Sequence, residues 1–255
     1  MSSVGQNTVL ITGATGAIGS ALAEQYADSG ADLVLFGKDN ERLDQLAHQC
    51  RMRGGQVTVR ACNLLDLTDF VQQLDAICRE KCPRLIIVNA GFSSTATGQG
   101  ETWEAIDRVV RINLLAAMAT VQTVVPHLRE HGGGKIALIS SLAAWYGLPI
   151  TPAYSATKAA LKNYGEALQG LLAKDGIMVS VVLPGFVESA MSRSVPGPKP
   201  FLLSADRAAA LIIRGLAAGR ARISFPFPLN LGCWFLAVLP PSLSGWLVKR
   251  SGYHG

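Results

Sequence analysis

Three side chains in the middle of the chain have the types and the spacing of a proton-transfer site. Ser141 is followed by Tyr154 thirteen residues later and by Lys158 four residues after that. Positions i and i+4 share one face of a helix, so the ammonium and the phenol would be neighbours. A nearby cation stabilises phenolate over phenol, and we therefore expect a lowered pKa for Tyr154. The phenol would then act as a general acid near neutral pH, while the Ser141 hydroxyl holds the substrate oxygen.

A glycine-rich turn near the N-terminus has the pattern of an anion-binding site. The residues TGATGAIG place Gly13, Gly16 and Gly19 three residues apart, after an apolar run and before a segment of helical period. Backbone amides at the start of a helix, approached through a turn without side chains, bind phosphate groups. The sequence therefore predicts that the diphosphate of a dinucleotide binds there.

The end of the next apolar run would reach the ribose of that dinucleotide. Phe36 and Gly37 are followed by Lys38, so a cation stands where a carboxylate would accept hydrogen bonds from a free 2′-hydroxyl. A cation favours a 2′-phosphate, and the sequence predicts NADP(H) in preference to NAD(H). The neighbouring Asp39 keeps NAD(H) open as the alternative.

Six motifs follow one another at the intervals of a known enzyme family. They are TGATGAIG from Thr12, VNAG from Val88, Asn113, Ser141, YSATK from Tyr154 and PG at 184–185. Together they resemble the compact form of the short-chain dehydrogenase/reductase family, and the resemblance covers about residues 7–225. It implies an oxidoreductase that binds NAD(P)(H) and moves hydride between a nicotinamide and a carbonyl or alcohol.

The resemblance also implies a catalytic tetrad and a set of cofactor contacts. Tyr154 would protonate the carbonyl oxygen as hydride reaches the carbon, and Ser141 would stabilise the developing alkoxide. Lys158 would tune Tyr154 and hold the nicotinamide ribose, and Asn113 would hold a water that relays protons toward Lys158. The cofactor contacts implied are Gly13, Thr15, Gly16, Ile18, Gly19, Lys38, Asn63, Leu64, Asn89, Ala90, Gly91, Tyr154, Lys158, Pro184, Gly185, Val187 and Ser189.

Four positions depart from the family pattern without removing a reacting group. Ala17 stands in the glycine turn where compact members have glycine, and Val88 replaces the first of two asparagines. Asn63 replaces an aspartate at the adenine, and its amide oxygen can still accept a hydrogen bond. Ser189 replaces a threonine and keeps the hydroxyl.

Short apolar runs that alternate with longer segments of helical period must position these residues. Runs rich in Val, Ile and Leu predict buried strands, and Ala-rich segments predict helices packed over them. The pattern predicts an α/β fold of Rossmann type, a doubly wound seven-stranded parallel sheet with helices on both faces, plus a short apolar helical C-terminal extension. We expect strands at 8–12, 32–37, 57–61, 84–88, 135–140, 178–183 and 222–225, and helices at 18–29, 41–51, 67–79, 102–131, 153–172 and 204–217.

The same pattern predicts one domain and the edge at which it works. Residues 1–225 would form the NAD(P)-binding catalytic unit, and residues 226–255 an apolar extension within the same domain. Ligands of such sheets bind beyond the carboxyl ends of the strands. We therefore expect function in the loops that follow strands, at 13–19, 37–39, 62–66, 89–95, 140–150 and 184–203.

Charge and cysteine usage narrow the class of protein further. Residues 1–180 carry 15 Lys and Arg against 16 Asp and Glu, whereas residues 181–255 carry 8 against 2. No aromatic-basic platform accompanies that surplus, so a nucleic-acid partner is not expected. Five cysteines without a C-x-x-C pair fit a reducing cytoplasm, and residues 1–7 leave no room for a signal peptide. His127 and His131 are interpreted as side chains that stabilise the C-terminal end of a helix, and no metal site is expected.

Apolar residues follow the predicted catalytic serine and the PG motif, which indicates a hydrophobic carbonyl or alcohol as substrate, lipid-like molecules included. We expect a pocket lined by Leu142, Trp145, Tyr146, Leu148 and Met191, and a mobile lid at 195–200 that carries Phe201 and Leu202. Two alternatives stay open: a reductase of a sugar or surface-polysaccharide precursor, and a regulator that binds NADPH without turnover.

The C-terminal segment is apolar with cations at its edge. Residues 223–248 contain no charged side chain, and four prolines leave pieces too short to span a membrane. We expect two short amphiphilic pieces, followed by Lys249 and Arg250. They suit peripheral contact with the inner face of a membrane, or a contact in a homodimer or homotetramer, or packing within the chain.

Overall fold

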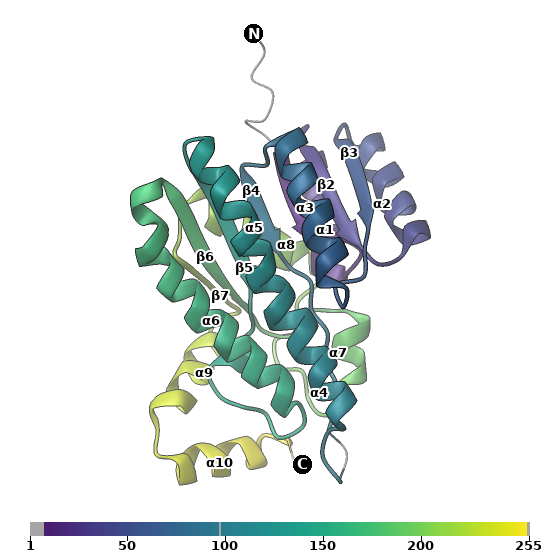
Figure 1. Cartoon of the computed structure of the whole chain (residues 1–255). Helices are drawn as coiled ribbons and strands as arrows, with labels where there is room; N and C mark the ends of the chain where they lie inside the picture. The colour runs from purple at the N-terminus through teal and green to yellow at the C-terminus, as the bar shows by residue number, and fades with distance from the viewer. Residues whose placement is uncertain (1–7, 97, 254–255) are drawn as a thin grey trace.

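Seven parallel strands form one sheet at the centre of the molecule (Figure 1). The computed structural model describes residues 8–96 and 98–253, so the expectation about residues 1–7 lies outside the described residues. The strand order is β3-β2-β1-β4-β5-β6-β7, and the predicted Rossmann-type sheet is confirmed. The strands are β1 (Thr8–Thr12), β2 (Asp32–Gly37), β3 (Gln56–Ala61), β4 (Leu85–Val88), β5 (Gly134–Ile139), β6 (Ile177–Pro184) and β7 (Arg222–Phe225).

Strand β1, next to the middle of the sheet, explains both the layering and the place of the site. All five residues of β1 are buried, as a strand covered by helices on both faces requires. It pairs with β2 on one side and β4 on the other, so that Leu10 lies opposite both Val34 and Ile86. Because the order of strands reverses between β1 and β4, their connections leave to opposite faces, and a crevice opens at the carboxyl ends.

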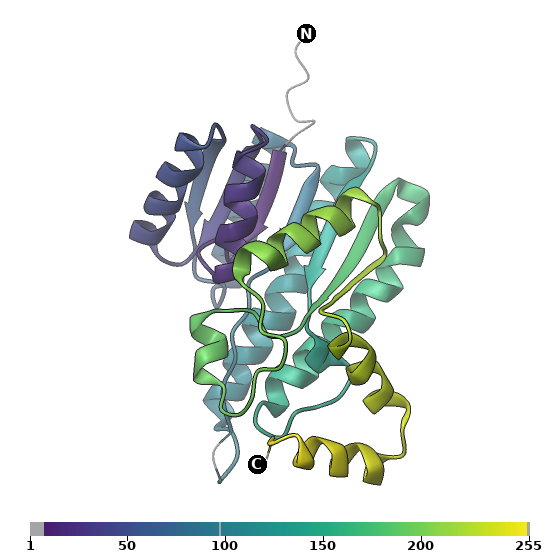
Figure 2. The ribbon, with the colours of Figure 1, turned by 180° about the vertical axis from the view of Figure 1, so that it is seen from behind.

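Two layers of helices cover the sheet, as the opposite views in Figures 1 and 2 show. On one face lie α1 (Ala17–Ala27), α2 (Asn40–Met52) and α8 (Ala205–Ala217), whose Leu22, Leu43 and Ile212 join one buried cluster. On the other lie α3 (Leu67–Lys81), α5 (Ala116–Glu130) and α6 (Pro152–Leu172), whose Leu74, Val124 and Leu161 join a second cluster. One-turn helices at Leu142–Ala144 and Ala173–Asp175 complete this side.

Several helices begin where a short polar side chain caps the first turn. Asp39 accepts a hydrogen bond from the backbone of Arg42 at the start of α2, and Asp66 does the same for α3. Thr102 and Ser204 cap the helices that follow them. Such caps satisfy amides that have no partner inside the helix, and each contributes about 1 kcal/mol.

The single helix expected over residues 102–131 is interrupted by a wide turn. It divides into α4 (Trp103–Val110), a π-helical turn at Arg111–Leu115 and α5. By length and composition, the stretch from Trp103 to Glu130 could cross a membrane, alone among the helices in the described part of the chain. Its apolar side chains, Val121 and Leu128 among them, pack against the sheet, which accounts for the composition.

Helix α7 (Ala190–Ser194) was not predicted, and the two helices of the C-terminal segment were predicted only as short amphiphilic pieces. Ser189 and Ser192 cap each other's backbone at the start of α7. The tail forms α9 (Leu229–Val238) and α10 (Pro241–Arg250), which lie below the carboxyl edge of the sheet (Figure 1). Leu229 packs against Leu142 and Leu183, and Val248 and Tyr253 pack against Ile150. The inner sides of the tail therefore belong to the same packed domain.

Two glycines of α6 test the close packing of this helix on the sheet. A Cβ on Gly165 would lie 2.5 Å from Cγ2 of Val181 and 2.9 Å from Cδ1 of Leu138, whereas a Cβ on Gly170 would meet nothing within 4 Å. We expect Gly165→Ala to lower the free energy of unfolding by about 1–3 kcal/mol through overpacking. Gly170→Ala, the matched control, is expected to raise it by about 0.5–1 kcal/mol through helix propensity. Urea denaturation of both variants measures the difference, and equal effects would contradict the packing argument.

Candidate active site

A cavity of about 880 Å³ opens beyond the carboxyl ends of the strands. It extends from the glycine turn after β1 to helices α9 and α10, and loops after six of the strands contribute to its wall. Nearly all the residues singled out from the sequence meet on this wall. They are Gly13, Thr15, Gly16, Ile18, Lys38, Asn63, Leu64, Asn89, Ala90, Gly91, Ser141, Tyr154, Lys158, Pro184, Gly185, Val187 and Ser189.

The glycine turn is shaped by a close approach of two loops. Gly13 has a φ of +63°, and a Cβ there would lie 2.7 Å from Cα of Ala90. The Asn89 side chain donates to the carbonyls of Thr12 (3.2 Å) and Gly13 (3.0 Å), which ties the ends of β1 and β4 together. No side chain caps α1 at Gly16, so the amides of its first turn can bind an anion.

Gly19 lies behind the glycine turn, and its predicted contact with the cofactor stays a prediction. It is buried and does not line the cavity. A Cβ there would lie 2.4 Å from the Gly13 carbonyl oxygen and 2.8 Å from Nδ2 of Asn89. The absence of a side chain at Gly19 therefore allows α1 to pack against the turn, and Gly13 and Gly16 of the turn line the cavity.

Two cations stand at the glycine-turn end of the cavity. Lys38 and Arg42 both line it, and Nη2 of Arg42 donates to the Thr15 carbonyl at 2.8 Å. The Asp39 carboxylate accepts from the Arg42 amide as the cap of α2. Arg42 was not predicted from the sequence. Its position four residues after Lys38, at the start of a helix, could have indicated a second cation near the predicted 2′-phosphate.

Asn63 uses its amide oxygen within its own loop. Its Oδ1 accepts a hydrogen bond from the Leu65 backbone at 3.2 Å, which shapes the loop after β3. The residue still lines the cavity. A second lone pair and the amide NH₂ remain available to a ligand.

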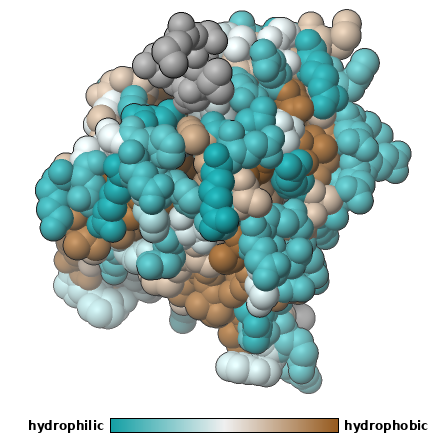
Figure 3. All heavy atoms as spheres, turned by 45° about the horizontal axis from the view of Figure 1, so that its top comes forward, coloured by the Kyte–Doolittle hydropathy of each residue, from teal (hydrophilic) through white to brown (hydrophobic). Residues whose placement is uncertain are grey.

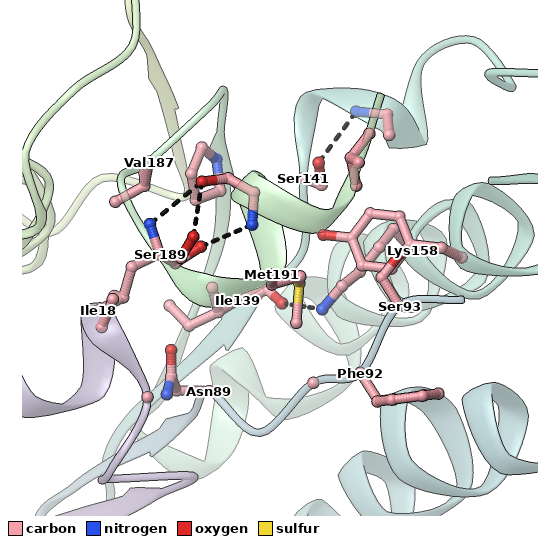
Figure 4. Close-up of a pocket in the computed structure, with 18 of the residues that line it drawn as sticks. Ile18, Asn89, Phe92, Ser93, Ile139, Ser141, Lys158, Val187, Ser189 and Met191 are labelled. Carbon is pink, nitrogen blue, oxygen red and sulfur yellow. Dashed lines mark hydrogen bonds between the residues drawn. The ribbon is translucent and has the colours of Figure 1, made fainter. Parts of the chain in front are cut away.

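The proton-transfer residues come from β5 and α6. Figure 4 shows Ser141 and Lys158 on the same side of the cavity. Ser141 follows β5, and its hydroxyl accepts from the Ala143 amide at 3.1 Å. Lys158 is 4% exposed, and its Nζ donates to the Ile139 carbonyl at 2.8 Å. This Nζ lies 5.6 Å from the centre of the Tyr154 ring.

The electrostatics of this group correct one expectation from the sequence. Burial raises the pKa of Tyr154 above its ordinary value of 10.0, and a hydrogen bond with Ser141 lowers it by a smaller amount. Burial also lowers the pKa of Lys158 from 10.5 to about 8. The expected lowering of the Tyr154 pKa by Lys158 is therefore wrong for this structure, because desolvation of the phenol outweighs the effect of a cation that donates to a backbone carbonyl. Tyr154 stays protonated at neutral pH, which is the form that donates a proton to a carbonyl oxygen.

Asn113 lies behind the cavity wall in the π-helical turn. It is fully buried and does not line the cavity. Its Oδ1 accepts from the Phe92 amide at 2.7 Å, and its Nδ2 donates to the Phe92 carbonyl at 2.9 Å and to Oγ1 of Thr157 at 3.1 Å. Asn113 thus holds the loop after β4 against the turn of α6 that precedes Lys158. The water relay implied by the resemblance stays a prediction.

The loop after β6 forms the opposite wall. Gly185 donates its amide to the Phe225 carbonyl at 2.8 Å, and a Cβ on it would lie 2.9 Å from Cδ of Pro226. Val187 and Ser189 line the cavity, and Ser189 caps α7. The loop after β6 is therefore fixed by contacts with Phe225 and Pro226, where β7 ends and the C-terminal segment begins.

The apolar end of the cavity differs in part from the predicted pocket. Leu142, Tyr146, Leu148 and Met191 line it as expected, but Trp145 does not. The Trp145 ring instead lies between two cations, 4.5 Å from Nζ of Lys162 and 5.1 Å from the Arg222 guanidinium. Phe201 and Leu202 are exposed and stand outside the wall, whereas Val195 and Pro200 of the expected lid belong to it.

Residues of the tail complete this end and were not predicted there. Leu229, Cys233 and Leu236 from α9 line the cavity together with Val248 and Tyr253. They lie 87 to 111 residues after Leu142 in the chain, and no local pattern predicts such a contact. The apolar character of these residues was the one sequence feature that could have indicated a buried or cavity-lining position.

The two histidines are engaged in contacts at the far end of the sheet. His127 Nε2 lies 2.7 Å from the Asp75 carboxylate, and His131 Nδ1 lies 2.7 Å from the His127 carbonyl. Within residues 8–96 and 98–253, no group of three His, Cys, Asp or Glu side chains could hold a metal ion.

The fold and the cavity define a dinucleotide-binding oxidoreductase, and comparison with known proteins agrees. The family model for short chain dehydrogenases matches residues 7–199. An uncharacterized oxidoreductase of Myxococcus xanthus is 32% identical over 254 residues, with 98% of this chain and 99% of that protein covered. The Arabidopsis thaliana 11-beta-hydroxysteroid dehydrogenase-like 2 is 32% identical over 228 residues, with 86% and 73% covered.

A solved structure extends this comparison. The short-chain dehydrogenase from Sphingobium yanoikuyae in complex with NADPH is 27% identical, with a TM-score of 0.81 over 95% of this chain and 94% of that one. The chain belongs to the short-chain dehydrogenase family and is an NAD(P)-dependent dehydrogenase or reductase.

The buried ammonium makes a prediction about stability that needs no substrate. Because the Lys158 pKa in the folded protein, about 8, lies below its ordinary value of 10.5, the unfolded chain binds more protons between these values. Folding stability contributed by this group therefore rises as pH rises from 8 to 10.5. Relative to Lys158→Met, the wild type is expected to gain roughly 3 kcal/mol across that range.

Urea denaturation of both proteins at pH 7, 8, 9 and 10 measures this difference. Lys174→Met, which alters an exposed lysine, is the control and should show no such trend. A stability difference between wild type and Lys158→Met that stays constant with pH would contradict the assignment.

Proposed function

We propose that the protein is an NADPH-dependent carbonyl reductase, or an alcohol dehydrogenase in the reverse direction, that acts on apolar substrates. The observation that carries the proposal is one cavity with two unlike ends. Cations and backbone amides line one end, apolar side chains line the other, and Ser141, Tyr154 and Lys158 stand on the wall between them. The steroid dehydrogenase-like name of the Arabidopsis relative supports an apolar substrate for this chain as well.

The residues of the first end fit NADP(H). The positive φ of Gly13 and its contact with Ala90 leave backbone without side chains where a diphosphate would lie beside the first turn of α1. Lys38 and Arg42 supply two cations for a 2′-phosphate. Asp39, the reason to keep NAD(H) open, has its carboxylate engaged as a helix cap. The NADPH complex of the Sphingobium relative supports the same preference.

When bound, the reduced nicotinamide supplies hydride to the carbonyl carbon, and the residues of the chain manage the charge that develops on oxygen. The Ser141 hydroxyl orients the substrate oxygen, and the protonated phenol of Tyr154 donates its proton to it. The phenolate left behind lies near Lys158. Because the pKa of Lys158 is about 8, most Lys158 side chains are positively charged at neutral pH. That cation stabilises the phenolate until a proton returns.

Removal of the phenolic hydroxyl tests this chemistry directly. We expect Tyr154→Phe to lower kcat for NADPH oxidation by at least about a hundredfold, the usual contribution of a positioned acid. NADPH binding, measured by fluorescence titration, should stay within about threefold of wild type. Leu202→Ala, at an exposed site outside the cavity, serves as the matched control.

The substrates offered in this assay separate the alternatives. Medium-chain aldehydes, bulky ketones and steroids represent the apolar class, and nucleotide sugars represent a surface-polysaccharide precursor. Higher kcat/KM for the sugars would overturn the apolar assignment. If cells that carry Tyr154→Phe keep the wild-type phenotype, the alternative that the protein is a regulator that binds NADPH without turnover would be favoured.

The two cations test the cofactor preference. Lys38→Asp combined with Arg42→Ala is expected to raise KM for NADPH by tenfold or more, about 1.4 kcal/mol, and to leave KM for NADH unchanged or lower. Lys174→Ala, at an exposed lysine that does not line the cavity, is the control for the loss of a surface cation. Equal effects on both cofactors would place the 2′-phosphate elsewhere.

A further inference from the structure

The outer sides of α9 and α10 gather much of the apolar surface of the protein. In residues 8–96 and 98–253, fifteen large apolar side chains are exposed, and seven of them fall within residues 227–246. The exposed fraction is 48% for Phe235 and 56% for Trp246, and it reaches 75% for Phe227. The seven are Phe227, Leu231, Trp234, Phe235, Val238, Leu243 and Trp246, which we call the tail surface.

The packing of the tail does not use these side chains. Leu229, Cys233 and Leu236 turn toward the cavity, yet none of the ten residues of α9 is buried. The face in Figure 3, which brings the top of Figure 1 forward, is by contrast covered mostly by hydrophilic residues, with hydrophobic ones in smaller patches. A concentrated apolar surface on one element marks a contact site.

The charge around the tail surface favours one class of partner. No acidic residue follows Asp206, whereas six Lys and Arg follow it. Two of them, Lys249 and Arg250, end α10, and the Arg250 guanidinium lies 5.7 Å from the centre of the Trp246 ring. The seven residues of the tail surface include no carboxylate, so a second copy that docked through the same seven residues would bring no anion from among them to Lys249 and Arg250. Anionic headgroups would neutralise them.

The dimensions and residue types fit a membrane interface. Each helix has ten residues, half the length that a spanning helix needs. Short helices that expose aromatic and aliphatic side chains and have cations at their edge suit the plane of the interface. Tryptophan prefers this depth, and Trp234 and Trp246 are both exposed.

We propose that the tail surface docks the protein on the interface of an anionic lipid bilayer. The apolar side chains enter the headgroup region, and Lys249 and Arg250 contact anionic headgroups. Because the inner sides of the same helices line the cavity, docking would place its apolar end next to the bilayer. The consequence that apolar substrates enter from the membrane rests on the proposed function, whereas docking itself does not.

Co-sedimentation of the full chain with vesicles tests the proposal. Vesicles of phosphatidylcholine with phosphatidylglycerol are compared with phosphatidylcholine alone, at low and high salt, without cofactor or substrate. We expect binding that requires phosphatidylglycerol and weakens with salt. Phe235→Ser with Trp246→Ser should weaken it about tenfold or more, and Lys249→Glu with Arg250→Glu should weaken it by a similar factor.

Matched variants away from the tail keep the result specific. Met52→Ser removes an apolar side chain that is 76% exposed on α2, and Lys174→Glu reverses an exposed charge. Both should bind vesicles like wild type. NADPH titration and circular dichroism of each variant establish that the fold is kept, and only variants that pass are compared.

Three results would overturn the proposal. The first is wild-type protein that stays in solution with every vesicle at low salt, and the second is tail variants that bind vesicles like wild type. The third is a homodimer or homotetramer that dissociates in Phe235→Ser with Trp246→Ser and does not bind vesicles, which would assign the surface to a second copy. Absence of turnover on apolar substrates leaves vesicle binding unaffected, so failure of the proposed function is distinguishable from failure of docking.

Discussion

The burial of the Lys158 ammonium is the constraint around which the site is built. A cation so far from water costs free energy unless its donors have acceptors. Its Nζ donates to the Ile139 carbonyl at the end of β5, and the Ser140 hydroxyl donates to the Lys158 carbonyl at 2.7 Å. Gly91 of the loop after β4 lies beside the ammonium, because a Cβ on it would be in ordinary contact with Nζ at 3.5 Å. One side chain therefore ties β5, α6 and the loop after β4 together.

The π-helical turn belongs to the same arrangement. It brings Asn113 to the Phe92 backbone and to Thr157, one residue before Lys158. A wide turn of this kind departs from ideal helix geometry and is found often at functional sites. Here it converts a core helix into a support for the residues that face the cavity.

The cavity joins two halves of the molecule with different chemistry. Strand order reverses between β1 and β4, which leaves backbone amides and the cations Lys38 and Arg42 at one end. At the other end the tail returns to the sheet and supplies apolar walls. Leu229, Cys233 and Leu236 of α9 and Val248 of α10 line the cavity, whereas Trp234, Phe235 and Trp246 leave an apolar surface facing outward. A protein that needed α9 and α10 only as a wall would have no physical reason to keep the outer side apolar.

Local sequence determined the elements and most of the candidate site. Strand composition, capping residues such as Asp39 and Asp66, the glycine turn and the i, i+4 spacing of Tyr154 and Lys158 all act over a few residues, and each was legible in the chain. Three features were decided only by the tertiary structure. They are the raised pKa of Tyr154, the position of the Trp145 ring outside the cavity, and the contribution of residues from α9 and α10 to the cavity wall. Burial depends on segments distant in the chain, and it sets both the desolvation of a charge and the partners that a side chain meets. No pattern of neighbouring residues carries that information.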